Sequence, residues 1–236
     1  MALIELTRAE LPYEINEEMK NLRTNIQFCG SDKQVIMMTS TFSGEGKTTV
    51  SLELCQSLTE LDMSVLLIDA DMRKSVLKKK VNGPAPKRGL SHYLSGQCEL
   101  DELVYKTSTP NFSVVFAGEV PPNPSELLSS PRFEDLIQLG REYFNYVIID
   151  CPPVGMVVDA AVVAPLCDGS VLLIEAGEVK YRAAQDMVNR MKTTGCPILG
   201  VILNKVDRKK QGKYYGKYYG KKYYGKYYGY YQHEEK

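Results

Sequence analysis

A glycine-containing segment near residue 45 has the residue types that bind nucleotide phosphates. The run Thr41-Phe42-Ser43-Gly44-Glu45-Gly46-Lys47-Thr48 follows an apolar stretch and precedes a helical pattern, although Thr41 stands where a phosphate loop usually has its first glycine. Glycines let backbone N–H groups turn toward phosphate oxygens, a lysine adds positive charge, and a threonine hydroxyl can ligate Mg²⁺. A glycine turn that caps a helix is the alternative interpretation. We predict ATP contacts from Ser43, Gly44, Glu45, Gly46, Lys47, Thr48 and Thr49.

Three aspartates follow apolar runs at positions where strands are expected to end. Asp69 and Asp71 lie on the same side of an extended chain because side chains alternate with period two. Asp150 follows a second apolar run. A single aspartate at such a position is commonly a cap, but three beside a phosphate loop suit Mg²⁺, which prefers hard oxygen ligands. We predict magnesium ligands from Thr48, Asp69 and Asp150.

Alternating strand and helix patterns predict the fold that positions these groups. Short, β-branched apolar runs predict strands at 35–38, 65–68, 114–116, 146–149, 171–174 and 199–203, and helical patterns lie between them, as at 48–61, 130–143 and 180–193. This rhythm predicts an α/β fold, a P-loop NTPase-like parallel sheet flanked by helices with right-handed crossovers. Ligands of such sheets bind beyond the carboxyl ends of the strands, where the loop and the aspartates fall.

Overall composition places the chain among ordinary globular proteins. The 29 Lys and Arg balance the 29 Asp and Glu, so no net field favours nucleic acid as a partner. The six cysteines have neither C-x-x-C pairs nor nearby histidines, which favours reduced thiols over disulfides or zinc. No apolar run approaches the roughly 20 residues that span a bilayer. We therefore expect a cytoplasmic protein that reaches the membrane only through a partner.

The composition changes sharply after Asp207. Lys-Tyr-Tyr-Gly recurs from Lys213, Lys217, Lys222 and Lys226, and few aliphatic residues are present to offset the entropy of ordering. We predict a disordered C-terminal tail at 208–236, after an N-terminal helical segment at 1–30 and a P-loop domain at 31–207. The tail tyrosines are Tyr214, Tyr215, Tyr218, Tyr219, Tyr223, Tyr224, Tyr227, Tyr228, Tyr230 and Tyr231.

With these residues in view, the chain resembles the bacterial tyrosine kinases, in the cytoplasmic form that Firmicutes use for capsular and exopolysaccharide biosynthesis. The resemblance covers essentially the whole chain. It is carried by the phosphate loop, by Asp69-x-Asp71-x-Arg73, by Asp150-x-Pro152-Pro153 and by the tyrosine cluster. Further family-like segments are Gly118 with the Pro-Pro-Asn-Pro-Ser-Glu-Leu-Leu run at 121–128, and Leu-Asn-Lys-Val at 203–206.

The resemblance implies a non-specific protein-tyrosine kinase that uses ATP and Mg²⁺ and phosphorylates its own tail tyrosines, between subunits. It adds Arg73 and Asn204 to the ATP-binding residues, although a structural ion pair is an equal alternative for Arg73. Glu17, Lys20 and Arg23 resemble the family's oligomerisation helix, with Lys20 in the place of its middle arginine. A solvated charged helix face is the alternative for these three residues.

For the phosphoryl transfer we expect the main tasks to be positioning and charge neutralisation. Lys47 and the loop amides hold the phosphates, and Thr48 and Asp150 organise Mg²⁺. Asp69 is the candidate to accept the tyrosine proton, and Asp71 is either metal support or the alternative base. We therefore predict four catalytic residues, Lys47, Asp69, Asp71 and Asp150.

The resemblance also implies partners. We expect a ring-like homo-oligomer, a transmembrane adaptor that activates the kinase at the inner face of the plasma membrane, a protein-tyrosine phosphatase, and protein substrates of polysaccharide synthesis. Tail phosphorylation is expected to loosen subunit association or change partner binding, because each phosphate adds about −1.5 to −2 of charge to a lysine-rich segment.

Two other functions remain as alternatives. A partitioning-type P-loop ATPase would act as a nucleotide-gated binding switch, but Phe42 stands where such proteins usually carry a signature lysine. A tail that binds nucleic acid is the second, because lysines contact phosphates and tyrosines stack on bases. We expect no nucleic-acid partner.

Overall fold

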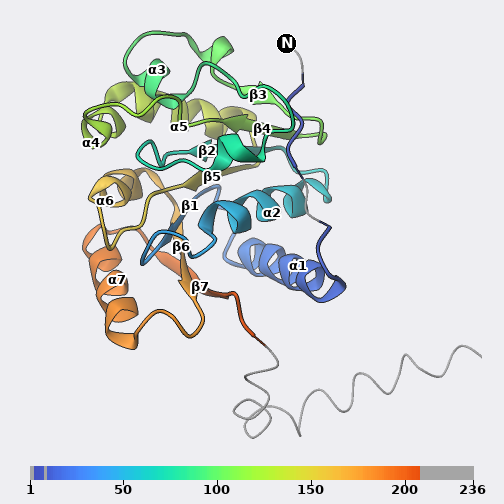
Figure 1. Cartoon of the computed structure of the whole chain (residues 1–236), viewed down its shortest axis with the longest axis vertical. Coiled ribbons are helices and arrows are strands. Elements are labelled where there is room, and N and C mark those ends of the chain that lie inside the picture. The colour runs from blue at the N-terminus through green and yellow to red at the C-terminus, as the bar shows by residue number, and fades with distance from the viewer. Residues whose placement is uncertain (1–2, 8–9, 208–236) are drawn as a thin grey trace, which may run out of the picture. The chain divides into compact units, whose positions relative to one another are not determined.

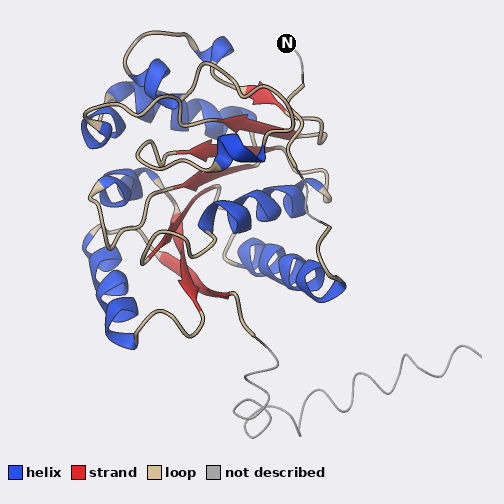
Figure 2. Cartoon of the chain, in the orientation of Figure 1, coloured by secondary structure: helices blue, strands red, loops and turns tan. Residues whose placement is uncertain are grey.

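The computed structural model describes residues 3–7 and 10–207, and the first unit of the chain runs from Met1 to Asn204. A seven-stranded sheet in the order β3-β4-β2-β5-β1-β6-β7 forms the centre of the first unit (Figures 1 and 2). The predicted tail at 208–236 lies outside the described residues. The strands are β1 (Val35–Ser40), β2 (Val65–Asp69), β3 (Tyr105–Lys106), β4 (Phe112–Val115), β5 (Tyr146–Asp150), β6 (Gly169–Glu175) and β7 (Ile198–Asn204).

Helices cover both faces of this sheet. Side chains alternate along β1, so Val35 and Met37 pack on one face with α3 to α7, while Ile36 and Met38 pack on the other with α1, α2 and η1. Because both faces are buried, the strands are continuous apolar runs. The helices are α1 (Tyr13–Phe28), α2 (Lys47–Thr59), α3 (Leu90–Leu94), α4 (Pro124–Leu128), α5 (Pro131–Tyr143), α6 (Asp159–Val163) and α7 (Tyr181–Thr193), with 3-10 turns η1 (Leu77–Lys80), η2 (Leu100–Glu102) and η3 (Ala164–Leu166).

The P-loop type of parallel sheet is confirmed, with one departure at its edge. All six predicted strands are present, and β1, β2, β4, β5, β6 and β7 pair in parallel. The two-residue β3 pairs antiparallel with β4. The sequence predicted a parallel sheet and gave no sign of this antiparallel edge strand. Pro124, in the Pro-Pro-Asn-Pro run, is the first residue of α4, a position where its missing N–H costs no hydrogen bond.

The N-terminal residues belong to the same compact unit as the sheet. The backbone N–H of Ile4 donates to Lys106 in β3 at 2.9 Å, and Leu6 forms an isolated bridge with Val81 after η1. Helix α1 then packs against α2. Among the described residues, no helix is long and apolar enough to cross a membrane.

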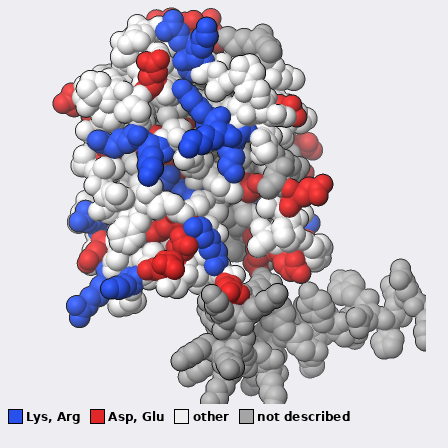
Figure 3. Space-filling view, viewed as in Figure 1, with Lys and Arg blue, Asp and Glu red and all other residues white. Residues whose placement is uncertain are grey.

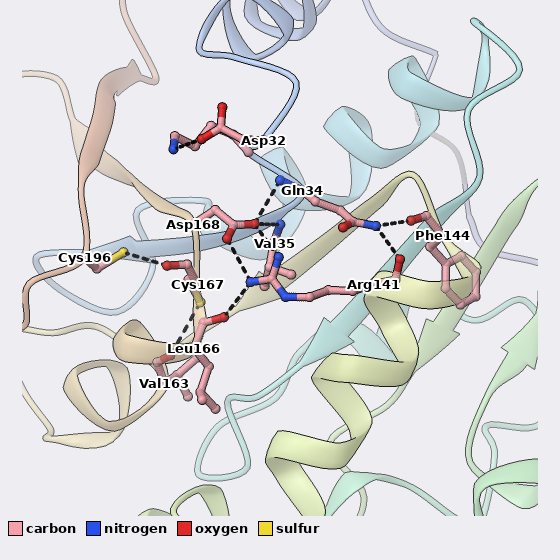
Figure 4. Close-up of polar contacts among 11 residues, drawn as sticks. Asp32, Gln34, Val35, Arg141, Phe144, Val163, Leu166, Cys167, Asp168 and Cys196 are labelled. Carbon is pink, nitrogen blue, oxygen red and sulfur yellow. Dashed lines mark hydrogen bonds and ion pairs between the residues drawn. The ribbon is translucent and has the colours of Figure 1, made fainter.

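A charged clamp fixes the edge of the sheet where β1 and β6 begin (Figure 4). The Asp168 carboxylate accepts hydrogen bonds from the backbone N–H groups of Gln34 and Val35 and from two nitrogens of Arg141, at 2.7 to 3.0 Å. Burial would raise the pKa of Asp168, but these donors hold it below its usual value. The Gln34 amide also donates to the carbonyls of Arg141 and Phe144, at 2.7 and 2.5 Å. These contacts join the end of α5 to the beginnings of β1 and β6. The candidate site lies at the other end of the strands, their carboxyl ends.

Candidate active site

The phosphate loop leaves the carboxyl end of β1 and leads directly into α2. Gly44 and Gly46 have φ of +92° and +95°, in the left-handed region where glycine is favoured, and α2 begins at Lys47. The buried Glu45 carboxylate accepts the backbone N–H groups of Thr41 and Phe42, at 3.2 and 3.0 Å. The loop is therefore closed by its own acidic side chain, and the Phe42 ring stands partly exposed on it.

Lys47, Thr48 and Asp150 form the buried centre of the site. The Lys47 ammonium donates to Oδ1 of Asp150 at 2.7 Å, and the Thr48 hydroxyl donates to Oδ2 of the same carboxylate at 2.5 Å. Burial alone would lower the pKa of Lys47, but attraction to Asp150 holds it above its usual value. A buried pair of this kind is strongly destabilised when one partner is lost, because the other charge is left uncompensated.

Asp69 lies directly beside Asp150, since the two are partners in the β2–β5 register. Its side chain accepts the Ser75 hydroxyl at 2.5 Å and the backbone N–H of Asp71 at 3.2 Å. Burial raises the pKa of Asp69 to about 8, and repulsion from Asp150 adds to the shift while Ser75 and Lys47 oppose it. A carboxyl group in this environment holds a proton at neutral pH while the site is empty of cations and nucleotide.

Asp71 and Arg73 continue the same loop after β2. The Asp71 carboxylate accepts the backbone N–H of Lys74 at 3.0 Å. Arg73 makes a two-pronged ion pair with Asp159 at the start of α6, with nitrogen to oxygen distances of 2.7 and 2.9 Å. Asp159 is wholly buried, and its hydrogen bond raises the pKa of Arg73. The structural ion pair considered for Arg73 is therefore present, and a role in ATP binding stays a prediction.

Asn204 reaches the phosphate loop from the carboxyl end of β7. Its side-chain amide donates to the carbonyl of Glu45 at 2.8 Å, and a Cβ atom built on Gly46 would lie 2.4 Å from that amide nitrogen. Gly46 is therefore required both by its backbone angle and by this close approach. A direct contact between Asn204 and adenine stays a prediction.

Two residues of the site, Asp159 and Ser75, were missed in the sequence, and Glu45, predicted as an ATP contact, has a further role in the loop that was not predicted. Asp159 and Ser75 hold Arg73 and Asp69, and Glu45 closes the loop with its carboxylate. Asp159 is 86 residues from Arg73 in sequence, so no local spacing could have revealed their pairing. A hydroxyl six residues after a strand-ending aspartate was the one signal for Ser75.

The described side chains fit a magnesium ion of the phosphate-loop type. The Thr48 hydroxyl and the Asp150 carboxylate are hard oxygen donors already in contact. Among residues 3–7 and 10–207, no group of three or more His, Cys, Asp or Glu forms a metal cage. Mg²⁺ keeps several waters and takes substrate phosphates as ligands, so the two oxygen donors of Thr48 and Asp150 fit it.

The three residues predicted for oligomerisation lie on α1. Lys20 pairs with Glu17 at 2.7 Å, one turn away on the exposed face. Arg23 donates to the carbonyl of Ser57 at 2.5 Å and pairs with Glu60 at 3.2 Å, so it joins α1 to the end of α2. Glu17 and Lys20 remain exposed enough to meet another copy, whereas the Arg23 side chain is only 12% exposed.

Comparison with known proteins agrees with this geometry. Residues 36–226 match the family described as CobQ/CobB/MinD/ParA nucleotide binding domain. A tyrosine-protein kinase CpsD of Streptococcus agalactiae is 42% identical over 191 residues, which cover 81% of this chain and 83% of the relative.

Solved structures give the same result. The chimerical protein CapA2B2 matches with a TM-score of 0.79 at 29% identity, covering 87% of this chain and 94% of its own. The kinase domain of the Escherichia coli tyrosine kinase ETK matches with a TM-score of 0.77 at 30% identity, covering 86% and 89%. With a nucleotide-binding domain over most of its length and kinase relatives of this similarity, the chain is a protein-tyrosine kinase and belongs to the bacterial tyrosine kinases, in their Firmicute form.

Proposed function

We propose that this kinase phosphorylates its own C-terminal tyrosines, between subunits, and thereby regulates capsular or exopolysaccharide synthesis and export. The observation that carries the proposal is the buried group at the carboxyl edge of the sheet. There Lys47 and Thr48 share the Asp150 carboxylate, and Asp69 lies beside it in register. This arrangement combines phosphate-binding charge with a carboxyl group of raised pKa, which is what transfer to a phenol requires.

The transfer itself needs few steps. The tyrosine hydroxyl oxygen forms a bond to the γ-phosphorus of ATP, the bond from that phosphorus to the β–γ bridging oxygen breaks, and ADP leaves. The phenolic proton, whose pKa is normally near 10, passes to Asp69 once that carboxylate is ionised. Asp71, two residues further on, is the second carboxylate available to the hydroxyl. Because Asp69 is a stronger base than an ordinary carboxylate, we assign the proton to it.

Charge neutralisation falls to Lys47 and to the cation site. On nucleotide binding the Lys47 ammonium exchanges its Asp150 partner for phosphate oxygens, with the loop amides around Gly44 and Gly46. Thr48 and Asp150 would hold Mg²⁺, which supplies further positive charge to the β and γ phosphates. Asp69 was predicted as a third magnesium ligand. In the structure its carboxyl group accepts a hydrogen bond from the Ser75 hydroxyl.

We further propose that the acceptor tail comes from a neighbouring subunit of a ring-like homo-oligomer. An acceptor segment that is tethered in an assembly has a high effective concentration at the next site. Glu17, Lys20 and Arg23 are the proposed contacts of that assembly. A transmembrane adaptor would recruit and activate the kinase at the inner membrane face, and a tyrosine phosphatase would reverse the modification.

Mass spectrometry after incubation with Mg²⁺-ATP tests the proposal, with and without an adaptor fragment. We expect phosphotyrosine within 214–231 in the wild type and none in Lys47→Met, whose fold is checked by circular dichroism. Asp69→Asn is expected to lower the rate more than Asp71→Asn at equal ATP saturation. ATP hydrolysis without phosphotyrosine, even with the adaptor present, would overturn the proposal in favour of a nucleotide-gated switch.

A further inference from the structure

A strongly basic stretch follows the catalytic loop of β2. Between residues 73 and 88 the chain has seven Lys and Arg and no Asp or Glu. We call this stretch the basic segment, and its charged residues are Arg73, Lys74, Lys78, Lys79, Lys80, Lys87 and Arg88. All seven are exposed or half-buried, and Figure 3 shows Lys and Arg side chains gathered across this face of the molecule.

The charge of the basic segment is almost wholly uncompensated. Of its seven cations, only Arg73 has a carboxylate partner within the part of the chain that the structure describes, through its pair with Asp159. Charged side chains usually lie among groups of both signs on a protein surface. Six cations without an ion-pair partner among the described residues therefore form a surface that favours an anionic partner.

Backbone contacts hold this surface in place beside the site. The Asp71 carboxylate accepts the N–H of Lys74 at 3.0 Å, which fixes the start of the basic segment next to the catalytic loop. Leu77 is fully buried, and the N–H of Thr7 donates to the carbonyl of Lys80 at 2.6 Å. These contacts fix the backbone that carries the lysines of η1. In sequence these lysines follow Asp69 and Asp71 by about ten residues.

We propose that the basic segment binds the phosphorylated form of the tail, an inference that rests on the proposed function. The tail at 208–236 has nine Lys and Arg against two Asp and Glu, so in its unmodified form it carries the same sign as the basic segment. Each phosphotyrosine adds about −1.5 to −2 of charge and three strong acceptor oxygens, so about four of them cancel the excess positive charge of the tail and further ones reverse its sign. Phosphates are good partners for Lys and Arg clusters.

This surface therefore distinguishes product from substrate by charge. An unmodified tail is repelled, and each added phosphate increases the attraction. A tail that has received its first phosphates stays near the site, and its remaining tyrosines are then modified faster than those of a fresh tail. The expected products are chains with several phosphates, with singly modified chains scarce.

The test uses full-length kinase without nucleotide and fluorescent synthetic peptides of residues 213–231. One peptide is unmodified, and the other has phosphotyrosine at the positions of Tyr227, Tyr228, Tyr230 and Tyr231. Fluorescence anisotropy is expected to show at least tenfold tighter binding of the phosphopeptide, the size that a few surface ion pairs supply together. The preference should weaken as salt is raised.

The double variant Lys79→Glu/Lys80→Glu is expected to lose most of this preference. Its matched control is Arg190→Glu/Lys192→Glu, which makes the same charge change at exposed positions of α7. Equal binding of the two peptides, or a preference that survives the Lys79/Lys80 reversal, would overturn the proposal.

Binding of the wild type to vesicles with 30% phosphatidylserine, lost in the same variant while neither peptide binds, would assign the surface to anionic lipid and also overturn it. Synthetic phosphopeptides make this result independent of the kinase reaction. Failure of the proposed function shows separately, as absence of phosphotyrosine after Mg²⁺-ATP.

Discussion

The protonation of Asp69 couples the stability of the empty site to pH. In the unfolded chain its pKa is near 3.9, and in the folded chain it is about 8. Between these values the folded state keeps a proton that the unfolded state has lost. Its contribution is therefore complete below about pH 4 and is lost as the pH rises toward 8, with a slope of at most about 1.4 kcal/mol per pH unit.

We expect Asp69→Asn to remove this dependence. Urea unfolding at pH 5, 6.5 and 8, with EDTA and without nucleotide, should show the variant gaining stability relative to wild type as pH rises. Asp135→Asn, an exposed change of the same type on α5, should keep a constant difference from wild type. A constant difference for Asp69→Asn as well would contradict the assignment.

The ion pair between Arg73 and Asp159 gives a second prediction at the residue scale. Arg73→Ala leaves a wholly buried carboxylate without its partner, which should lower the free energy of unfolding by about 1 to 3 kcal/mol. Adding Asp159→Asn should restore part of the loss, because the buried charge is then gone. Chemical denaturation of the single and double variants measures this coupling.

ATP kinetics of the same variants separate the two roles considered for Arg73. If Arg73 also contacts phosphates, Arg73→Ala raises the KM for ATP and Asp159→Asn does so much less. If both variants have the same KM for ATP and Arg73→Ala still loses stability, the role of Arg73 is structural only.

At the scale of elements, the phosphate loop depends on β7 through Gly46 and Asn204. An alanine at Gly46 must adopt a left-handed φ and also push the Asn204 amide from the Glu45 carbonyl. Gly44 has nearly the same φ but no atom within 4 Å of its built Cβ, so Gly44→Ala is the matched control. The strained backbone costs both variants about 1 to 2 kcal/mol.

Gly46→Ala should lose about 0.5 to 1.5 kcal/mol more than Gly44→Ala, the usual worth of one hydrogen bond. Combining Gly46→Ala with Asn204→Ala should cost no more than Gly46→Ala alone, because both changes remove the same hydrogen bond. Urea unfolding of the set measures this. Equal losses in Gly44→Ala and Gly46→Ala would show that the loop does not rest on Asn204.

The elements that could be predicted are those with long patterns. The six predicted strands are buried apolar runs, and α2, α5 and α7 are thirteen residues each, long enough for a helical period to show. Helices α3, α4 and α6 have five residues each and were not predicted. The two residues of β3, Tyr105 and Lys106, contain no apolar run and are set by pairing with β4.

The site follows the same division. Lys47, Thr48, Asp69 and Asp150 were predicted as site residues because they follow predicted strands. In the structure Lys47 and Thr48 contact Asp150, and Asp69 is its partner in the β2–β5 register, while their roles in the reaction stay predictions. The partners that come from distant elements, such as Asp159, depend on tertiary packing. Chain spacing contains no information about them, so they require the folded structure.

At the scale of the whole molecule, charge is divided unevenly between domain and tail. The chain has no net charge, yet its last 29 residues carry nine Lys and Arg against two Asp and Glu, which leaves 20 against 27 in the rest. Seven of those 20 cations belong to the basic segment, so the rest of the domain is strongly acidic, and we expect its acidic surface to attract the unmodified tail of a neighbouring copy at low salt. Phosphorylation of the tail, as proposed above, would remove this attraction.

We expect the assembly of the kinase to loosen after about four phosphates per chain. Each adds about −1.5 to −2 of charge, so about four cancel the excess positive charge of the tail, and further phosphates make every copy strongly acidic. After incubation with Mg²⁺-ATP, light scattering measures the mass of the assembly and native mass spectrometry counts the phosphates. The mass of the assembly should fall when each chain carries about four phosphates. A variant with all ten tail tyrosines changed to Phe is the control, and it should keep its assembly under the same treatment. If wild type and this variant respond alike, charge reversal of the tail does not govern the association of the subunits.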